Sequence, residues 1–239
     1  MVICAALLAA CAQAEPEDCR AVKHAGQAFT VCSFSVDEDI RLHLTHADGN
    51  PVAQFERLEA FVEEDGKELV FAMNAGMYHT DRSPVGLYIE DGKLTAPIVT
   101  RAGPGNFGML PNGVFAIMND GGVQILETSE YAEAGGEVRS ATQSGPMLVI
   151  AGSLHPKFNP DGTSRRRRNG VGISADRQTI SFAISDGFVT FHEFATLFRD
   201  VLKTPNALYL DGTVSRMFAP SIDRNESGLD MGPIVSVVR

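Results

Sequence analysis

The sequence predicts a single α+β domain, built on mixed, mostly antiparallel sheets with two main helices. Short apolar or alternating runs recur along the chain, and glycine-containing turns separate them, as in strand-rich folds. Two segments show the apolar spacing of an amphipathic helix. The chain has 239 residues, of which 44% are hydrophobic and 21% charged, so it can bury one substantial core.

The first predicted elements are two strands followed by a helix. Gln27–Phe34 and Ile40–Thr45 alternate apolar and polar residues, and we expect them to be antiparallel neighbours. Asn50 as N-cap and Pro51 as the first helical residue then open an amphipathic helix that stops near Gly66.

The remainder of the chain is predicted to be strands, interrupted by one helix. Ten predicted strands are separated by turn-forming residues: Glu68–Met73, Val85–Ile89, Leu94–Val99, Gly113–Met118, Val123–Leu126, Pro146–Ile150, Val171–Ser174, Thr179–Ser185, Asn206–Leu210 and Pro233–Val238. The second and third form a hairpin through an Asp-Gly turn, and the fourth and fifth form another. Thr190 and Glu193 make a T-x-x-E capping box, which opens a helix that runs to about Leu202.

The N-terminal segment is predicted to be an export leader. Residues 2–12 form an apolar run that is too short to span a bilayer and ends in small residues. An A-x-A cleavage site follows and divides the chain into a leader, 1–14, and a domain, 15–239. Residues 8–11 alternatively resemble a bacterial lipobox, which would place a lipid tether on Cys11. We therefore expect an exported protein, periplasmic or extracellular.

Export determines how the cysteines are interpreted. Cys4 and Cys11 fall in the leader, which leaves Cys19 and Cys32 in the mature chain. In an oxidising compartment such a pair forms a structural disulfide, worth roughly 3 kcal/mol for so short a loop. A metal site is disfavoured because two cysteines without a closely spaced group of histidines make a poor ligand set.

The charge of the chain limits its partners. A formal net charge of −10 argues against affinity for nucleic acids or acidic membranes. Against this background the basic run Arg165 to Arg168 stands out. Guanidinium groups suit bidentate binding of phosphate or carboxylate, and Arg168, beside an Asn-Gly turn, is the best placed of the four.

An aspartate at the end of a buried strand is the strongest candidate for chemistry. The apolar run before Asp211 predicts burial, and burial of a carboxylate is costly unless it is paired or hydrogen-bonded. Gly212, Thr213 and Ser215 follow it, and Arg216 is a candidate partner for its charge.

Similar polar glycine turns follow several other predicted strands. They are Asn74-Ala-Gly-Met, Pro111-Asn-Gly-Val, Ser144-Gly-Pro-Met, Arg168-Asn-Gly-Val-Gly and Ser185-Asp-Gly. Each alone is an ordinary turn, but their recurrence indicates that several loops line one cleft, where glycines let backbone N–H groups approach a ligand.

Other catalytic motifs are missing from the sequence. It contains neither a G-x-S-x-G elbow nor a P-loop, and its six histidines lack the spacing of metal ligands. We therefore expect no metal and no cofactor. His79 and His155 fall in candidate cleft loops, and His155 is taken as a substrate-binding candidate.

Taken in order, these motifs resemble the phosphodiester glycosidase family. The resemblance rests on Asn74-Ala-Gly-Met, Ser83-Pro-Val-Gly-Leu, Asn106-Phe, Pro111-Asn-Gly-Val-Phe, Ser144-Gly-Pro-Met-Leu, Arg168-Asn-Gly-Val-Gly, Ser185-Asp-Gly and Leu210-Asp-Gly. It covers the chain from about Glu68 to the C-terminus. The family commonly carries Leu-Asp-Gly-Gly-Gly-Ser, whereas Thr213 and Val214 stand here in place of glycines.

The resemblance implies hydrolysis of a sugar-1-phosphodiester in an envelope or extracellular glycan. It implies Asp211, Asp186 and Arg168 as the catalytic residues, with Arg168 on the phosphate. The residues expected to bind substrate are Asn74, Gly76, Asn112, Ser144, Asn169, Thr213, Ser215 and His155. Two alternatives remain open: a non-catalytic binder of anionic polysaccharide, and a hydrolase of another phosphoester or glycosidic bond. The sequence leaves the oligomeric state undetermined.

Overall fold

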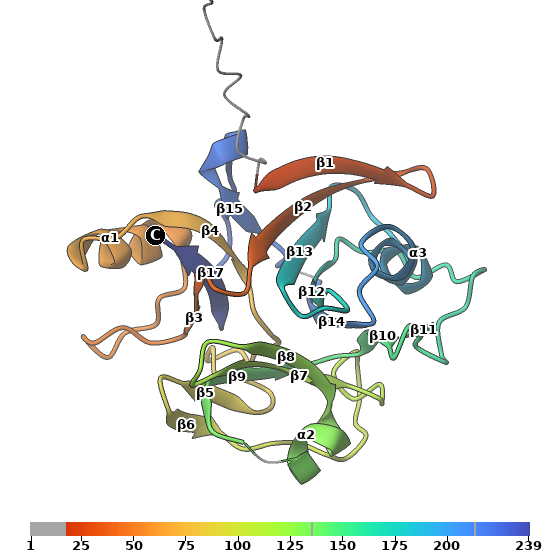
Figure 1. The fold of residues 1–239 in the computed structure, drawn as a ribbon, viewed down its shortest axis with the longest axis horizontal. Coiled ribbons are helices and arrows are strands. Elements are labelled where there is room, and N and C mark those ends of the chain that lie inside the picture. The colour runs from red at the N-terminus through yellow and green to blue at the C-terminus, as the bar shows by residue number, and fades with distance from the viewer. Residues whose placement is uncertain (1–17, 135, 213) are drawn as a thin grey trace, which may run out of the picture.

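Three antiparallel sheets dominate the computed structural model, which describes residues 18–134, 136–212 and 214–239 (Figure 1). Sheet A has the order β1 (Cys19–His24), β2 (Gln27–Ser35), β13 (Thr179–Ser185), β12 (Asn169–Ile173), β14 (Asn206–Asp211), β10 (Met147–Ile150), β11 (Ser153–Leu154). Sheet B has the order β16 (Arg224–Asn225), β15 (Met217–Ala219), β4 (Leu69–Asn74), β17 (Ile234–Val238), β3 (Asp39–His43). Sheet C has the order β6 (Lys93–Ala96), β5 (Tyr88–Glu90), β9 (Val138–Ser144), β7 (Gly113–Met118), β8 (Val123–Glu127). This arrangement confirms the predicted α+β class.

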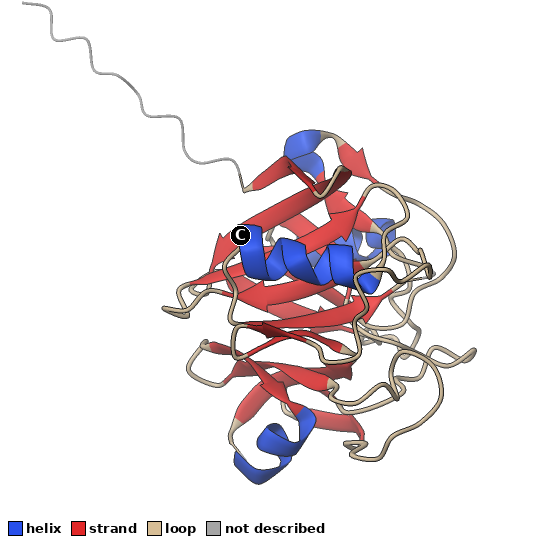
Figure 2. Cartoon of the chain, turned by 90° about the vertical axis from the view of Figure 1, so that its right-hand side faces the viewer, coloured by secondary structure: helices blue, strands red, loops and turns tan. Residues whose placement is uncertain are grey.

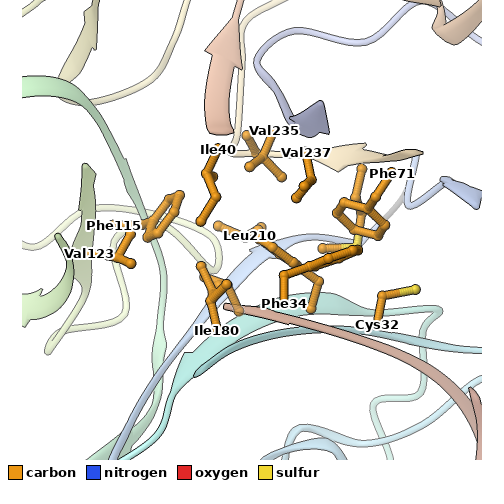
Figure 3. Close-up of a cluster of buried hydrophobic side chains, with 14 of the residues drawn as sticks. Cys32, Phe34, Ile40, Phe71, Phe115, Val123, Ile180, Leu210, Val235 and Val237 are labelled. Atoms are coloured by element: carbon orange, nitrogen blue, oxygen red, sulfur yellow. The ribbon is translucent and has the colours of Figure 1, made fainter. Parts of the chain in front are cut away.

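The three sheets share one apolar core. Phe34 and Ile180 of sheet A, Phe71 and Val237 of sheet B and Phe115 of sheet C lie in the same buried cluster (Figure 3). The rings of Phe34 and Phe71 have centroids 5.4 Å apart, so sheets A and B meet directly. Each fully buried phenylalanine contributes about 2 kcal/mol of hydrophobic stabilisation. The core therefore holds the ends of all three sheets in fixed positions.

Helices cover the outer faces of two sheets, and Figure 2 shows one helix lying across the strands in the foreground. The helices are α1 (Phe55–Glu64), α2 (Thr128–Ala134) and α3 (Phe191–Thr196), with a π-helical turn η1 (Leu197–Val201) and a 3₁₀ turn η2 (Pro220–Ile222). Helix α3 packs Phe194 against sheet A, and the η1 turn packs Phe198 against the same sheet. Helix α1 packs Phe55, Leu58 and Val62 against sheet B. The capping box predicted at the start of α3 is confirmed.

Two of the local predictions are wrong. Strands β2 and β3 are not neighbours, because β2 pairs with β1 and β13 while β3 pairs with β17. Alternation identifies the buried face of a strand but not its partner. The first helix begins at Phe55 rather than at Pro51, which forms a bridge with Thr45. Ala53 has a φ of 58°, which interrupts any helix that begins before it.

The predicted disulfide joins Cys19 and Cys32, which face each other across β1 and β2. The leader predicted over 1–14, with Cys4 and Cys11, lies outside the described residues. Within residues 18–134, 136–212 and 214–239, no helix has the length and hydropathy needed to cross a membrane.

Candidate active site

The candidate site lies where strand ends of sheets A and B meet. Asp211 is the last residue of β14, Asn169 the first of β12, and Asn74 the last of β4. Asn169 pairs with Asp211, and the register shifts between Asn169 and Gly170. Because of this register shift, the side chains of Asn169 and Asp211 do not follow the regular up-and-down alternation of a strand, and both reach residues of sheet B.

A ring of hydrogen bonds joins the two asparagines to Asp211. The Asp211 backbone N–H donates to Asn169 Oδ1 at 2.7 Å, and Asn169 Nδ2 donates to the Asn74 carbonyl at 3.1 Å. Asn74 Nδ2 donates to Asp211 Oδ2 at 3.4 Å, while Asn74 Oδ1 accepts from the backbone N–H of Arg216 at 2.8 Å. Both asparagines are fully buried, so their orientation is fixed by these partners.

Asp211 is a partly exposed residue whose carboxylate is closely surrounded by protein atoms. Its Oδ1 accepts from the Gly212 N–H at 2.6 Å, and its backbone carbonyl accepts from Ser215 Oγ at 2.9 Å. No basic side chain of the described residues forms an ion pair with it. Burial raises the pKa of Asp211 to about 6, and the Gly212 hydrogen bond opposes part of that rise. The carboxylate therefore titrates in a range useful for acid–base work.

Arg216, the partner suggested by sequence, points elsewhere. Its guanidinium donates to Gln54 Oε1 at 3.1 Å and to the Leu229 carbonyl. Only the backbone N–H of Arg216 takes part in the site, through its bond to Asn74. Thr213, another predicted substrate-binding residue, lies outside the described residues.

Tyr209 belongs to the site, and sequence reasoning missed it. A Cβ built on Gly212 would lie 2.2 Å from Tyr209 Oη, so the hydroxyl sits directly against the residue that follows Asp211. The guanidinium carbon of Arg168 lies 5.6 Å from the Tyr209 ring centroid, and burial raises the pKa of Tyr209 well above its usual value. The phenol is therefore a neutral O–H group beside the candidate carboxylate.

Arg168 lies in the interior behind Tyr209. Its Nε donates to the Val189 carbonyl at 3.0 Å, its Nη2 donates to the Ser164 carbonyl at 3.1 Å, and its guanidinium carbon lies 3.5 Å from the Phe191 ring centroid. Only 1% of the residue is exposed, and burial lowers its pKa. No carboxylate of the described residues pairs with it. Arg168 is thus a buried positive charge next to the Tyr209 hydroxyl.

Asp186 belongs to a separate chain of charges. It forms an ion pair with Arg224 at 2.9 Å and accepts a hydrogen bond from Thr30 Oγ1 at 3.2 Å. Glu226 links Arg224, at 3.0 Å, to Arg167. The structure therefore directs the Asp186 carboxylate to Arg224 and shows no contact with Asp211.

Three other predicted residues hold the framework around the site. Ser144 Oγ donates to the Leu210 carbonyl at 2.8 Å, which fixes β9 of sheet C to β14. Asn112 donates to the Phe107 carbonyl at 2.9 Å and accepts from Thr128 Oγ1 at 2.7 Å. A Cβ on Gly76 would lie 2.8 Å from Thr142 Oγ1, so this glycine permits close packing.

His155 lies at the far end of an aromatic stack. Its ring is 4.8 Å from that of Phe158, which in turn stacks on Phe191 at 5.0 Å. His155 is 1% exposed, and burial lowers its pKa. Residues 18–134, 136–212 and 214–239 contain no group of three His, Cys, Asp or Glu side chains placed to hold a metal ion.

Comparisons with known proteins place this geometry in a family. The phosphodiester glycosidase family model matches residues 67–232. A curated protein of Escherichia coli (strain K12), Uncharacterized protein YigE, is 34% identical over 193 residues, covering 80% of this chain and 73% of that protein.

Two solved structures share the fold at low sequence identity. The catalytic domain of zebrafish N-acetylglucosamine-1-phosphodiester α-N-acetylglucosaminidase, auto-inhibited by its pro-peptide, matches with a TM-score of 0.63 and 14% identity over 92% of this chain and 81% of that one. A Burkholderia pseudomallei K96243 protein described as exported matches with a TM-score of 0.58 and 12% identity, over 88% and 74%. Because the family model covers most of the sequence, the chain belongs to the phosphodiester glycosidase family and is a hydrolase of that class.

Proposed function

We propose that the protein hydrolyses a glycosyl phosphodiester in an exported or envelope glycan, with Asp211 as its catalytic carboxylate. The observation that carries this proposal is the setting of Asp211. Its carboxylate is largely surrounded by protein, pairs with no cation of the described residues and is held between Asn74 and Gly212. A carboxylate in such a position stabilises positive charge or accepts a proton far better than one neutralised by an arginine.

The chemistry of the bond matches these groups. Water attacks the anomeric carbon, the bond from that carbon to the phosphate oxygen breaks, and its electron pair leaves on the phosphate. The sugar carbon becomes positive in the transition state, which the ionised Asp211 stabilises while it takes the proton of the attacking water. A phosphate monoester has a second pKa of about 6, so it leaves without a strong general acid.

Arg168 and Tyr209 supply the complementary charge. The buried guanidinium lies 5.6 Å from the Tyr209 ring centroid, and the Tyr209 hydroxyl lies against Gly212. We assign Tyr209 as a donor to the departing phosphate, with Arg168 acting through it as well as by its field. Asn74, Asn169 and Ser215 hold Asp211 and the adjoining backbone in place.

Export of the protein forms part of the proposal. A disulfide between Cys19 and Cys32 is typical of an oxidising compartment, and the Burkholderia pseudomallei protein of similar fold is described as exported. Lipid attachment at Cys11, if the lipobox is used, would tether the domain to a membrane surface.

The decisive measurement is release of free sugar from a panel of α-glycosyl-1-phosphodiesters. Asp211→Asn is expected to lower kcat by about a hundredfold or more, whereas Asp186→Asn, a matched loss of one carboxylate, is expected to lower it far less. Full activity of Asp211→Asn would refute the assignment. A wild type that binds the diesters without cleaving them would favour the non-catalytic binder. Activity lost on chelation and restored by a divalent ion would favour a metal-assisted hydrolase.

A further inference from the structure

A cavity of about 250 Å³ lies beside Arg168 and outside the group of residues assigned above. The loop that follows β11, the start of α3 and Met109 line it. Its lining residues are Met109, Lys157, Phe158, Asn159, Gly162, Thr163, Ser164, Thr190, Phe191 and His192. Two of them contact Arg168, because the Ser164 carbonyl accepts from Nη2 and Phe191 stacks on the guanidinium. The cavity therefore shares a wall with the buried cation.

One tyrosine ring separates the cavity from the catalytic carboxylate. Phe191 packs edge-to-face on Tyr209, with ring centroids 4.9 Å apart. The Tyr209 hydroxyl lies against Gly212, the neighbour of Asp211. The cavity and the carboxylate therefore lie on opposite sides of the Tyr209 side chain.

The chemistry of the lining suits a hydroxylated ring. Phe158 and Phe191 stack at 5.0 Å with planes 5° apart, which gives the cavity a rigid apolar wall. The lining also includes residues with hydroxyl, amide and imidazole groups, namely Thr163, Asn159 and His192. Pockets for drug-sized ligands begin at about 300 Å³, so this cavity fits a single ring better than a large apolar ligand.

The charge of the lining is positive in a protein of net negative charge. Lys157 is exposed and forms no ion pair with any carboxylate of the described residues, and the ten lining residues include no acid. Outside the lining, the same loop carries Arg166, which is exposed and forms no ion pair among the described residues, and one exposed carboxylate, that of Asp161. The cations of this region therefore outnumber its free carboxylate. An anionic ligand is therefore favoured here over a neutral or cationic one.

We propose that this cavity binds the next sugar phosphate unit of a polymeric substrate, with its ring against Phe158 and its negative charge near Lys157. The inference rests on the proposed function and deepens it, because it assigns the enzyme to glycans with repeated phosphodiester bonds rather than to isolated diesters.

The test compares two substrates of defined structure. One is a methyl α-glucosyl phosphodiester, and the other is a trimer of glucose units joined by 1→6 phosphodiesters. The measured quantity is the ratio of kcat/KM for the trimer to that for the methyl diester. In the wild type we expect a ratio of about ten or more, falling as salt is added, because one buried ring and one charge contact contribute on the order of a tenfold gain.

Two variants remove the subsite in different ways, and each has a matched control. Lys157→Ala removes the charge and Thr163→Phe fills the cavity, and both are expected to lower the ratio about tenfold, through KM for the trimer. The controls are Lys23→Ala on β1 and Thr179→Phe at the first residue of β13. Both positions are exposed, as Lys157 and Thr163 are, and neither lines the cavity, so we expect the wild-type ratio.

The outcomes separate this inference from the proposed function. An unchanged ratio in Lys157→Ala and Thr163→Phe overturns the subsite while cleavage itself stands. If the wild type cleaves neither substrate, the proposed function fails, and calorimetric titration of the trimer then decides the subsite. A Kd for the trimer that Lys157→Ala raises about tenfold supports the subsite, and the same Kd in wild type and variant overturns it.

Discussion

Replacing Asp211 by asparagine should change stability in a pH-dependent way that follows from the burial of the carboxylate. Its pKa rises from 3.8 in the unfolded chain to about 6 in the folded protein, a difference worth about 3 kcal/mol. Between about pH 4 and pH 6 the folded state retains a proton that the unfolded state has lost. Stability of the wild type therefore falls as pH rises through this window, and the full penalty is present above it.

The neutral variant escapes this penalty but loses one hydrogen-bond acceptor. Gly212 N–H and Asn74 Nδ2 both donate to Asp211, and an asparagine offers only one oxygen. The mismatch costs about 1 to 3 kcal/mol at every pH. The stability of Asp211→Asn relative to wild type is therefore expected to improve by about 2 kcal/mol from pH 4 to pH 7.

Urea unfolding at a series of pH values measures this difference. The comparison requires that the slope of the unfolding free energy against urea concentration (the m-value) is the same for both proteins. Asp186→Asn serves as the control, because its carboxylate is 38% exposed and pairs with Arg224. That variant is expected to lose at most about 1 kcal/mol of stability. A difference between wild type and Asp211→Asn that does not vary with pH would show that the carboxylate is not desolvated.

Three further predictions concern the disulfide, the contact between Gly212 and Tyr209, and the cap of helix α3. Cys19→Ser is expected to lower the free energy of unfolding by about 3 kcal/mol, as should reduction of the wild type, and a Tm insensitive to reductant would contradict this. Gly212→Ala should displace the Tyr209 hydroxyl and lower kcat/KM by about a hundredfold, whereas Gly187→Ala, with open space around its Cβ, should not; equal activities would count against the hydroxyl's role. Thr190→Ala removes the capping box and should cost about 1 kcal/mol in urea unfolding, with Thr190→Ser restoring most of it.

Hydrophobic pattern and turn chemistry identify most of the fold, but they fail where a strand buries polar residues. The hairpin β7–β8 and the Thr190 cap follow directly from local sequence. Strand β9 is missed because its inward positions include Thr142 and Ser144 instead of aliphatic residues. Their hydroxyls donate to backbone carbonyls across the sheet junction, contacts that depend on residues distant in sequence.

The candidate site likewise contains residues that the sequence predicts and residues that it does not. Asn74 and Asn169 lie with Asp211 because each ends or begins a strand at the same junction, and Ser215 lies in the loop between β14 and β15. Tyr209 is missed because an aromatic residue in an apolar run predicts only core packing. The burial of Arg168 and the pairing of Asp186 with Arg224 depend on tertiary contacts that no local pattern specifies.

The junction of three sheets also determines when the site forms during folding. Asn74 ends β4, and β4 pairs with β17, a strand that lies far from it in the sequence. Ser144 attaches sheet C to the strand of Asp211 from a third region of the sequence. We therefore expect the arrangement around Asp211 to form only once β17 has joined β4 in sheet B.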